Sequence, residues 1–423
     1  MFILKVYKIL FLISDIINII GKFFEGCDSM NILVVGNGFD LAHGLPTRYS
    51  NFLNFIKEFK SYFSYNVPKE LISFNFLYIL ENLNSDYKNL KYEIMDLIKD
   101  NNWIEYFDNI SEDGNWVDFE QEISKVVKFL DSLYKEASEK DITDIESPIS
   151  LCAVFDEFKL YYIKNFFKNI EKYTSDVSYY YEIGGIYAIH IDNIVKISNF
   201  LLKDLDRLIR CLEIYLELIS EKYLTEESKI RGIKELNIER VISFNYTNTF
   251  EKLYDINKNV EYDFIHGKAK LYNDVNTSNI ILGIDEYLPK DEKDKNLTFV
   301  KFKKFYQRVY KKTGCLYNSW LKEHLKTIKI LFSSYNGDDY FDDLGAEPIN
   351  IYIFGHSLDI TDKDILNTLI MNKLSKVTIF YHNKDELSKK IINTIKIIGQ
   401  DNLIEFVHGA NPKLKFIDQN TLL

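Results

Sequence analysis

The first half of the chain predicts one short strand followed by a long helical stretch. Residues 32–35 are apolar and partly β-branched, as in a buried strand, and Gly36-Asn37-Gly38 follows directly. A helix is expected to begin near Thr47, with Thr47 as its N-cap, and to continue over residues 49–60. From there to about residue 235, apolar positions recur every three or four residues and predict helices over residues 71–83, 116–134, 155–170 and 194–219.

Strand-like runs return after residue 240 and alternate with helical stretches. Strands are predicted at residues 241–244, 262–265, 280–283, 351–354, 377–381 and 403–407, and helices at 247–254, 362–373 and 386–398. This alternation predicts an α/β fold whose mainly parallel, Rossmann-like sheet has about six or seven strands. An ordinary dinucleotide fold returns to its second strand within about thirty residues, whereas this chain takes about two hundred, which indicates a large helical insertion.

These patterns divide the chain into four segments. Residues 1–29 form an apolar extension, and residues 30–60 hold the first strand, the glycine loop and the first helix of the α/β domain. Residues 61–235 form the helical insertion, and residues 236–423 the remainder of the α/β domain.

The extension allows two interpretations. Its apolar run, residues 9–20, is too short to span a bilayer, and polar residues at helical spacing would give an amphipathic helix able to contact a membrane or a partner. Alternatively, the start codon is assigned too early and the native chain begins at Met30, directly before the first strand. We prefer the second interpretation.

Composition and charge narrow the class of protein. With 46% hydrophobic and 27% charged residues the chain is globular, and a net charge of −11 argues against a nucleic-acid-binding protein. The basic run at residues 301–312 is interpreted as one solvated helix face. Four scattered cysteines predict neither a disulfide framework nor a metal site and fit a reducing cytoplasm. We expect a cytoplasmic homo-oligomer without a metal.

Polar residues gather at the predicted carboxyl ends of the strands, where parallel sheets bind ligands. The glycine loop and the following helix would form an anion cradle, or merely a tight turn. Each histidine, taken alone, is more often structural. The residues expected to bind a nucleotide are Gly36, Asn37, Gly38, Phe39 and His43 after the first strand and Gly355, His356, Ser357 and Asp359 after a later one. Asp40, Asn245 and His266 are further candidates for the site.

One carboxylate stands out in the helical stretch. Glu120 falls on the same helical stripe as Phe119 and Ile123, which are expected to be buried. A carboxylate facing inward is costly unless it is paired or functional. Glu120 is therefore expected either to meet an Arg or a Tyr hydroxyl on a neighbouring helix or to belong to a site.

Residues 30–47 resemble the opening signature of the AbiH family of bacteriophage abortive-infection proteins. Shorter segments resemble later motifs of that family in the same order, at residues 116–120, 244–247, 265–267 and 355–358. The resemblance covers roughly residues 30–410 and implies a role in phage defence, set off by a phage-derived trigger.

The same motifs resemble, more distantly, sirtuin-like NAD-consuming domains. That resemblance implies that Asn245 lies near the nicotinamide ribose, that His266 is the catalytic histidine, and that Gly355, Ser357 and Asp359 contact the nucleotide. Asp40 stands where sirtuins have serine, and Thr247 where such motifs have aspartate. Cysteines of a zinc ribbon are missing from the sequence, so protein deacetylation is not expected.

The chemistry implied is cleavage of NAD, or of a related nucleotide, at the nicotinamide–ribose bond through an oxocarbenium-like state. Asn245 would hold ribose hydroxyls or water, His266 would act as base, and Asp40 or Glu120 would stabilise positive charge. The glycine loop would hold the pyrophosphate. A nucleotide-binding sensor without catalysis is the alternative, and a toxin acting on nucleic acid is disfavoured by the negative charge.

Overall fold

The computed structural model describes residues 30–65, 68, 73–85, 87–111, 118–139, 191–225, 230–331, 348–409 and 411–422. The extension at residues 1–29, the helix predicted at 155–170 and the start of the helix predicted at 116–134 lie outside these ranges. Within the described ranges, no helix has both the length and the apolar character needed to cross a membrane.

A six-stranded parallel sheet forms the centre of the fold, which confirms the α/β, Rossmann-like prediction. Its spatial order is β3-β2-β1-β4-β5-β6, the doubly wound arrangement, with a topological switch point between β1 and β4. The strands are β1 (Met30–Val35), β2 (Arg240–Ser243), β3 (Glu261–Phe264), β4 (Ile349–Phe354), β5 (Ser375–Tyr381) and β6 (Leu414–Asp418).

The register brings the ends of the central strands to one edge. Val35 pairs with Ser243 of β2 and with Phe354 of β4, so the loops that follow these three strands start side by side. Residues 32–35 are all buried because helices cover both faces of the sheet, which explains their continuous apolar run.

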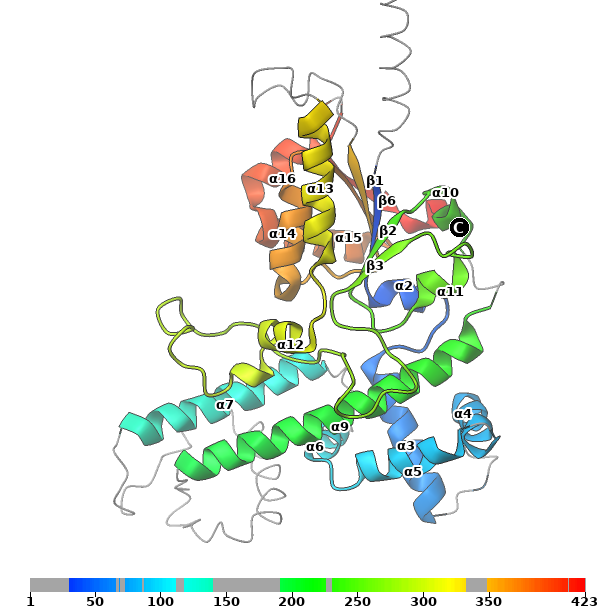
Figure 1. Ribbon diagram of the computed structural model, residues 1–423, viewed down its shortest axis with the longest axis vertical. Coiled ribbons are helices and arrows are strands. Elements are labelled where there is room, and N and C mark those ends of the chain that lie inside the picture. Colours follow the sequence, from blue (N-terminus) through cyan, green and yellow to red (C-terminus); the bar gives the residue numbers. More distant parts are fainter. Residues whose placement is uncertain are drawn as a thin grey trace, which may run out of the picture.

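Two hydrophobic clusters cover the two faces of the sheet. Ile32 and Val34 pack with α13 (Leu316–Leu331), α14 (Lys363–Met371) and α16 (Gln400–Val407), together with the end of α15 (Lys384–Ile398). Leu33 and Val35 face the opposite way, toward α2 (Asn37–Ala42), α10 (Arg231–Glu235) and α11 (Thr249–Leu253). Figure 1 shows these two helical layers on either side of the strands.

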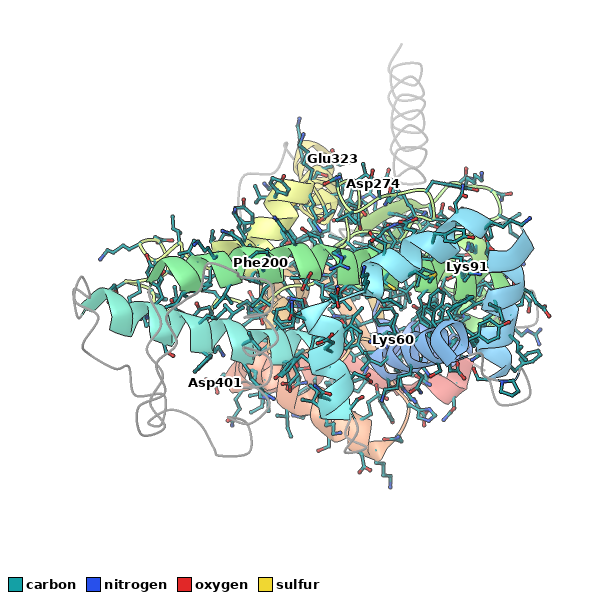
Figure 2. The ribbon with its side chains drawn as sticks, turned by 90° about the horizontal axis from the view of Figure 1, so that it is seen from below. Lys60, Lys91, Phe200, Asp274, Glu323 and Asp401 are labelled. Carbon is teal, nitrogen blue, oxygen red and sulfur yellow. The ribbon has the colours of Figure 1, made fainter. Side chains whose placement is uncertain are left out.

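The helical part lies beyond the carboxyl ends of the strands (Figure 1). Figure 2 looks onto it from below and shows α7 and α9 side by side, with Phe200 labelled on α9. Its core also includes residues from the segment after β3, such as Leu282 and Phe302. The helices are α3 (Tyr49–Tyr65), α4 (Phe74–Ser85), α5 (Lys88–Ile98), α6 (Asn102–Ser111), α7 (Phe119–Glu139) and α9 (Ile191–Tyr223).

The chain from β3 to β4 then returns to the sheet. The short 3-10 helix η4 (Val300–Phe302) leads into α12 (Lys304–Lys311), which lies between the helical part and α13 (Figure 1). After β4, the 3-10 helix η5 (Ile360–Asp362) precedes α14, and η6 (Gln419–Leu422) follows β6.

The strand predicted at residues 403–407 is wrong, because this segment belongs to helix α16. Leu403, Phe406 and Val407 turn toward the same core at helical spacing, and periodicity alone does not distinguish so short an apolar run from a strand. The last strand is β6 instead, which pairs with β5.

The strand predicted at residues 280–283 is also wrong. Ile280, Ile281 and Leu282 are buried, but they belong to no strand of the sheet, and the Ile281 N–H donates to the carbonyl of His266 at 2.8 Å. Ile280 and Leu282 pack into the helical core, which buries the run without adding a strand.

The helix expected near Thr47 differs in its start. The short helix α2 begins at Asn37, directly after Gly36, and α3 begins at Tyr49. The Thr47 hydroxyl donates to Oδ1 of Asn37 at 2.5 Å, so it ties α2 to the segment that precedes α3.

Candidate functional site

A cavity of about 990 Å³ lies at the carboxyl edge of the sheet, at the switch point between β1 and β4. Residues of the helical part, including Tyr49 and Leu212, close it from the other side. The structure brings to this cavity most residues expected from the sequence: Gly36, Asn37, Gly38, Asp40, Glu120, Asn245, His266, Gly355, His356, Ser357 and Asp359. Asp285 lines the cavity as well.

The loops after β1 and β4 touch through their backbones, which explains their glycines. A Cβ on Gly38 would lie 2.7 Å from the Cα of Gly355, and a Cβ on Gly355 would lie 2.0 Å from the nitrogen of Phe39. Gly355 also has a φ of +69°, a conformation that glycine adopts without strain. These glycines therefore permit close approach of two loops.

Three of the N–H groups that an anion cradle could use are already hydrogen-bonded within the protein. Gly36 N–H donates to Phe354 O at 3.2 Å, Gly38 N–H to Gly355 O at 2.8 Å, and Phe39 N–H to Gly36 O at 2.8 Å. Of the two interpretations of this loop, the geometry supports the tight turn.

Phe39 and His43 do not face the cavity. Phe39 is fully buried in the core beneath the sheet, beside Phe250 and Phe354. His43 Nδ1–H donates to the carbonyl of Phe39, and its Nε2 contacts the hydroxyl of Tyr254, both at 2.7 Å. The geometry therefore makes both residues packing groups, contrary to the nucleotide contacts expected of them.

Asp40 and Asn245 hold the loop after β2 against the loop after β1. The hydroxyls of Thr247 and Thr249 donate to the two carboxylate oxygens of Asp40 at 2.5 and 2.7 Å. Burial raises the pKa of Asp40 from 3.8 to about 6, and these hydrogen bonds oppose that rise. Asn245 Nδ2 donates to the carbonyl of Gly36 at 2.9 Å. Both side chains thus make fixed contacts between loops in addition to lining the cavity.

Asp362, the last residue of η5, lies between two histidines. Its Oδ1 is 3.4 Å from Nε2 of His266, which follows β3, and its Oδ2 is 3.4 Å from Nε2 of His356, which follows β4. Burial alone would raise the pKa of Asp362, but hydrogen bonds from both histidines and the charge of Lys304 hold it well below the usual value. Asp362 is therefore a carboxylate that orients two imidazoles.

The two histidines differ in their remaining nitrogen. The N–H of Leu358 donates to Nδ1 of His356 at 2.9 Å. Nδ1 of His266 is buried and has no hydrogen-bond partner among the described residues. A buried acceptor without a partner is costly and calls for an explanation, and a base awaiting a substrate or water supplies one.

Glu120 and Lys304 join the helical part to this cluster. Nζ of Lys304, at the start of α12, lies 2.7 Å from Oε2 of Glu120 on α7 and 4.0 Å from Oδ1 of Asp362. Burial alone would lower the pKa of Lys304, but the charges of Glu120, Asp362 and Asp285 raise it. Burial raises the pKa of Asp285 from 3.8 to about 6. The partner of Glu120 is thus a lysine, not the Arg or Tyr hydroxyl expected, and Glu120 also lines the cavity.

The basic run at residues 301–312 is only partly the solvated face that the sequence predicted. Lys303 and Lys304 are buried, and Lys311 Nζ donates to the carbonyl of Ile280 at 2.6 Å. Lys304, Gln307 and Lys311 follow one another at helical spacing, which places them on one side of α12. This helical spacing could have indicated that the three residues share one face of a helix. Because a polar stripe usually faces water, however, the sequence did not point to Lys304 as a residue of the site.

The cavity as a whole carries more negative than positive groups. Within the described ranges, no group of three or more His, Cys, Asp or Glu residues is placed to hold a metal ion. Eight carboxylates and four cationic side chains line the cavity: Asp40, Asp118, Glu120, Asp285, Glu286, Asp359, Asp362 and Glu386 against Arg48, Lys125, Lys128 and Lys304.

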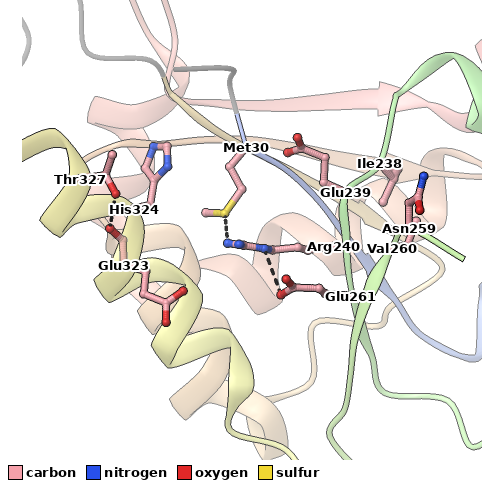
Figure 3. Close-up of a pocket in the computed structure, with 10 residues that line it drawn as sticks. All are labelled: Met30, Ile238, Glu239, Arg240, Asn259, Val260, Glu261, Glu323, His324 and Thr327. Atoms are coloured by element: carbon pink, nitrogen blue, oxygen red, sulfur yellow. Dashed lines mark hydrogen bonds and ion pairs between the residues drawn. The ribbon is translucent and has the colours of Figure 1, made fainter. Parts of the chain in front are cut away.

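A second cavity, of about 610 Å³, lies at the opposite edge of the sheet. Figure 3 shows His324 and Thr327 of α13 on one side of Met30, and Arg240 and Glu261 on the other. Arg240 is paired with Glu261 at 3.5 Å. This cavity holds none of the candidate residues, and it lies at the amino ends of the strands, where parallel sheets do not bind their ligands.

Comparison with known proteins identifies the family. The model of the family described as "Bacteriophage abortive infection AbiH" matches residues 32–383, from the third residue of β1 to just beyond the end of β5. No curated protein and no solved structure matches the chain. A match over this much of the sequence shows that the chain belongs to the AbiH family of bacteriophage abortive-infection proteins.

Proposed function

We propose that this AbiH-family chain is an abortive-infection effector that binds NAD or a related nucleotide at the switch point and hydrolyses its glycosidic bond. A phage-derived trigger starts the reaction in the cytoplasm. One observation carries the proposal: His266, placed against Asp362, lines a cavity of about 990 Å³, and its buried Nδ1 has no hydrogen-bond partner in the described part of the chain. Cavities of this size hold ligands as large as nucleotides.

His266 and Asp362 supply a base for the attack of water on the nucleotide. Nδ1 of His266 takes a proton from a water molecule enclosed in the cavity, while its Nε2–H faces the carboxylate of Asp362. The water oxygen forms a bond to the ribose C1′, and the bond from C1′ to the nicotinamide nitrogen breaks with its electron pair going to nicotinamide. The products are nicotinamide, ADP-ribose and the proton first held by His266. No acid is needed, because nicotinamide leaves as a neutral molecule.

The charges of the lining suit a positively charged reacting centre. The nicotinamide ring of NAD is cationic, and positive charge moves onto the ribose in the oxocarbenium-like state. Asp285 and Glu120 are the carboxylates near Lys304 that can face this charge. The cationic side chains of Arg48, Lys125 and Lys128 also line the cavity and take the pyrophosphate. The N–H groups of Gly36, Gly38 and Phe39 are already bonded within the protein.

A sensor without catalysis is the second candidate, and one contact favours it. The Glu120–Lys304 pair, with its N–O distance of 2.7 Å, joins α7 of the helical part to α12 beside the sheet. A nucleotide that competes for Lys304 would change that link and so pass the binding event to the helical part.

Incubation of the purified full chain with NAD separates the two functions. We expect the wild type to release nicotinamide, measured by chromatography, and His266→Ala and Asp362→Asn to reduce the rate at least about a hundredfold. His408→Ala is the matched control, because His408 is exposed and does not line the cavity. Circular dichroism verifies that each variant is folded.

The outcomes are distinct. If calorimetry shows that NAD binds but no nicotinamide is released, the result supports the sensor. If neither binding nor release occurs with NAD or with other common nucleotides, with or without lysate from infected cells, the proposed function is wrong. If His266→Ala is folded and as active as the wild type, His266 is not the base.

A further inference from the structure

His356 is held in one tautomer by its own loop. The backbone N–H of Leu358 donates to Nδ1 of His356 at 2.9 Å, so Nδ1 is an acceptor and the proton of the neutral ring is on Nε2. That Nε2 lies 3.4 Å from Oδ2 of Asp362. The ring therefore has its donor directed at the carboxylate and its lone pair occupied.

The loop that sets this tautomer is strained and fixed from several sides. Leu358 has a φ of +57°, a left-handed conformation that is costly for a branched residue, and its side chain is fully buried. Lys390 Nζ donates to the carbonyl of His356 at 3.0 Å, and Asn393 Nδ2 to that of Ser357 at 3.1 Å. The ring also lies edge-on to Phe244, with centroids 4.3 Å apart.

The two histidines around Asp362 thus differ in what they can do. Among the residues that the structure describes, Nδ1 of His266 has no hydrogen-bond partner, whereas Nδ1 of His356 accepts from Leu358. A buried carboxylate with a single donor can rotate, whereas one held from both oxygens is fixed. Both Nε2–O distances are 3.4 Å, longer than an ordinary hydrogen bond, and such contacts commonly shorten when a substrate closes the site.

We propose that His356 is a positioning residue, whose Nε2–H orients Asp362 so that Asp362 holds His266 as the Nε2–H tautomer with Nδ1 free. This assignment differs from the nucleotide binding expected of His356 from the sequence. It rests on the proposed function for the reaction that His266 performs, but the tautomers themselves do not depend on any reaction.

Two substitutions separate the roles of the two ring nitrogens of His356. In His356→Asn, the amide oxygen sits near the former Nδ1 and accepts from Leu358, but the donor to Asp362 is lost. In His356→Gln, the amide nitrogen reaches the former Nε2 position and donates to Asp362, but the acceptor for Leu358 is lost. A purely structural role predicts that Asn is the better replacement, whereas a positioning role predicts Gln.

The first readout is nitrogen NMR of the full chain labelled only at histidine, which reports the tautomer of each ring. We expect the wild type to show the Nε2–H tautomer at both His266 and His356. His356→Gln keeps that tautomer at His266, and His356→Asn gives a mixture. The proposal is overturned if His356 of the wild type carries its proton on Nδ1. It is also overturned if His356→Asn is folded and the signals of His266 are the same as in the wild type.

The second readout is nicotinamide release. We expect His356→Asn to lower kcat about tenfold with little change in KM, the loss of about one hydrogen bond, and His356→Gln to stay within about threefold of the wild type. Equal activities of the two variants overturn the proposal. If the wild type releases no nicotinamide, the proposed function fails, but the NMR spectra still decide between the two roles of His356.

Discussion

The buried carboxylate of Asp40 leads to a prediction about stability and pH. Asp40 is 1% exposed, and its two oxygens accept hydrogen bonds from the hydroxyls of Thr247 and Thr249. A side-chain hydrogen bond from Asn245 also opposes the rise of its pKa. No cation lies among the causes of its pKa shift, so burial dominates and raises that pKa from 3.8 to about 6. The folded state therefore favours the neutral acid. Asp40→Asn keeps the shape of the side chain and removes the titration.

The direction of this pH dependence follows from the higher pKa of Asp40 in the folded state than in the unfolded state. The neutral form contributes stability that is fully present below the unfolded-state pKa and is lost as the pH rises through the folded-state value of about 6. One pH unit of difference in pKa corresponds to about 1.4 kcal/mol, so the whole effect is on the order of 3 kcal/mol. About 2 kcal/mol of it falls between pH 4.5 and pH 7.5.

Urea unfolding of the wild type and of Asp40→Asn at several pH values measures this effect. We expect the free energy of unfolding of the wild type, relative to that of the variant, to fall by about 2 kcal/mol as the pH rises from 4.5 to 7.5. Equal m-values show that both proteins unfold between the same states. A difference that stays constant, or that grows with pH, would refute the reasoning.

The remaining predictions concern the loops and charged groups at and near this site. Gly355→Ala should lower the free energy of unfolding by more than about 3 kcal/mol or prevent soluble expression, because its Cβ would lie 2.0 Å from the nitrogen of Phe39. Gly44→Ala, at φ +80° with open space around it, should cost only about 1–2 kcal/mol by the same urea titration. Lys304→Ala should lower the free energy of unfolding by about 3–5 kcal/mol, because it leaves carboxylates unpaired. Combining Lys304→Met with Glu120→Gln should recover most of that loss. An equal loss in the double variant and in Lys304→Ala would contradict the pairing of Lys304 with Glu120. Thr247→Val removes a donor to Asp40 and should move its pKa above 6, an effect visible in a carboxyl-carbon NMR titration.

The predictions from sequence succeeded where burial leaves a pattern along the chain. Residues 32–35 are all buried, and of residues 351–354 all except the partly exposed Tyr352 are buried. Strands covered on both faces are apolar along most of their length. The same reasoning failed for residues 403–407, because a short apolar run fits one face of a helix as well as it fits a strand. The edge strand β6 was missed, because its burial is partial and depends on its pairing with β5.

For the candidate site, too, some predictions from the sequence about the position of side chains were right and others were wrong. The sequence placed Asn245, His266 and the residues after β4 at strand ends, and the order of a parallel sheet is enough to bring such ends to one edge. It did not distinguish His43, which packs in the core, from His266, which lines the cavity. Both follow a strand, and their difference lies in the direction of the side chain.

The sequence by itself determined the fold class, the family and the edge of the sheet where polar groups gather, because these follow from periodicity, motif order and chain topology. Only the tertiary structure decided that Asp362 lies between His266 and His356 and that Lys304 pairs with Glu120. These residues come from α7, α12, η5 and the loops after β3 and β4. Which of them meet is determined by how those elements pack, and a lysine on a polar stripe looks the same in sequence whether it faces water or a buried carboxylate.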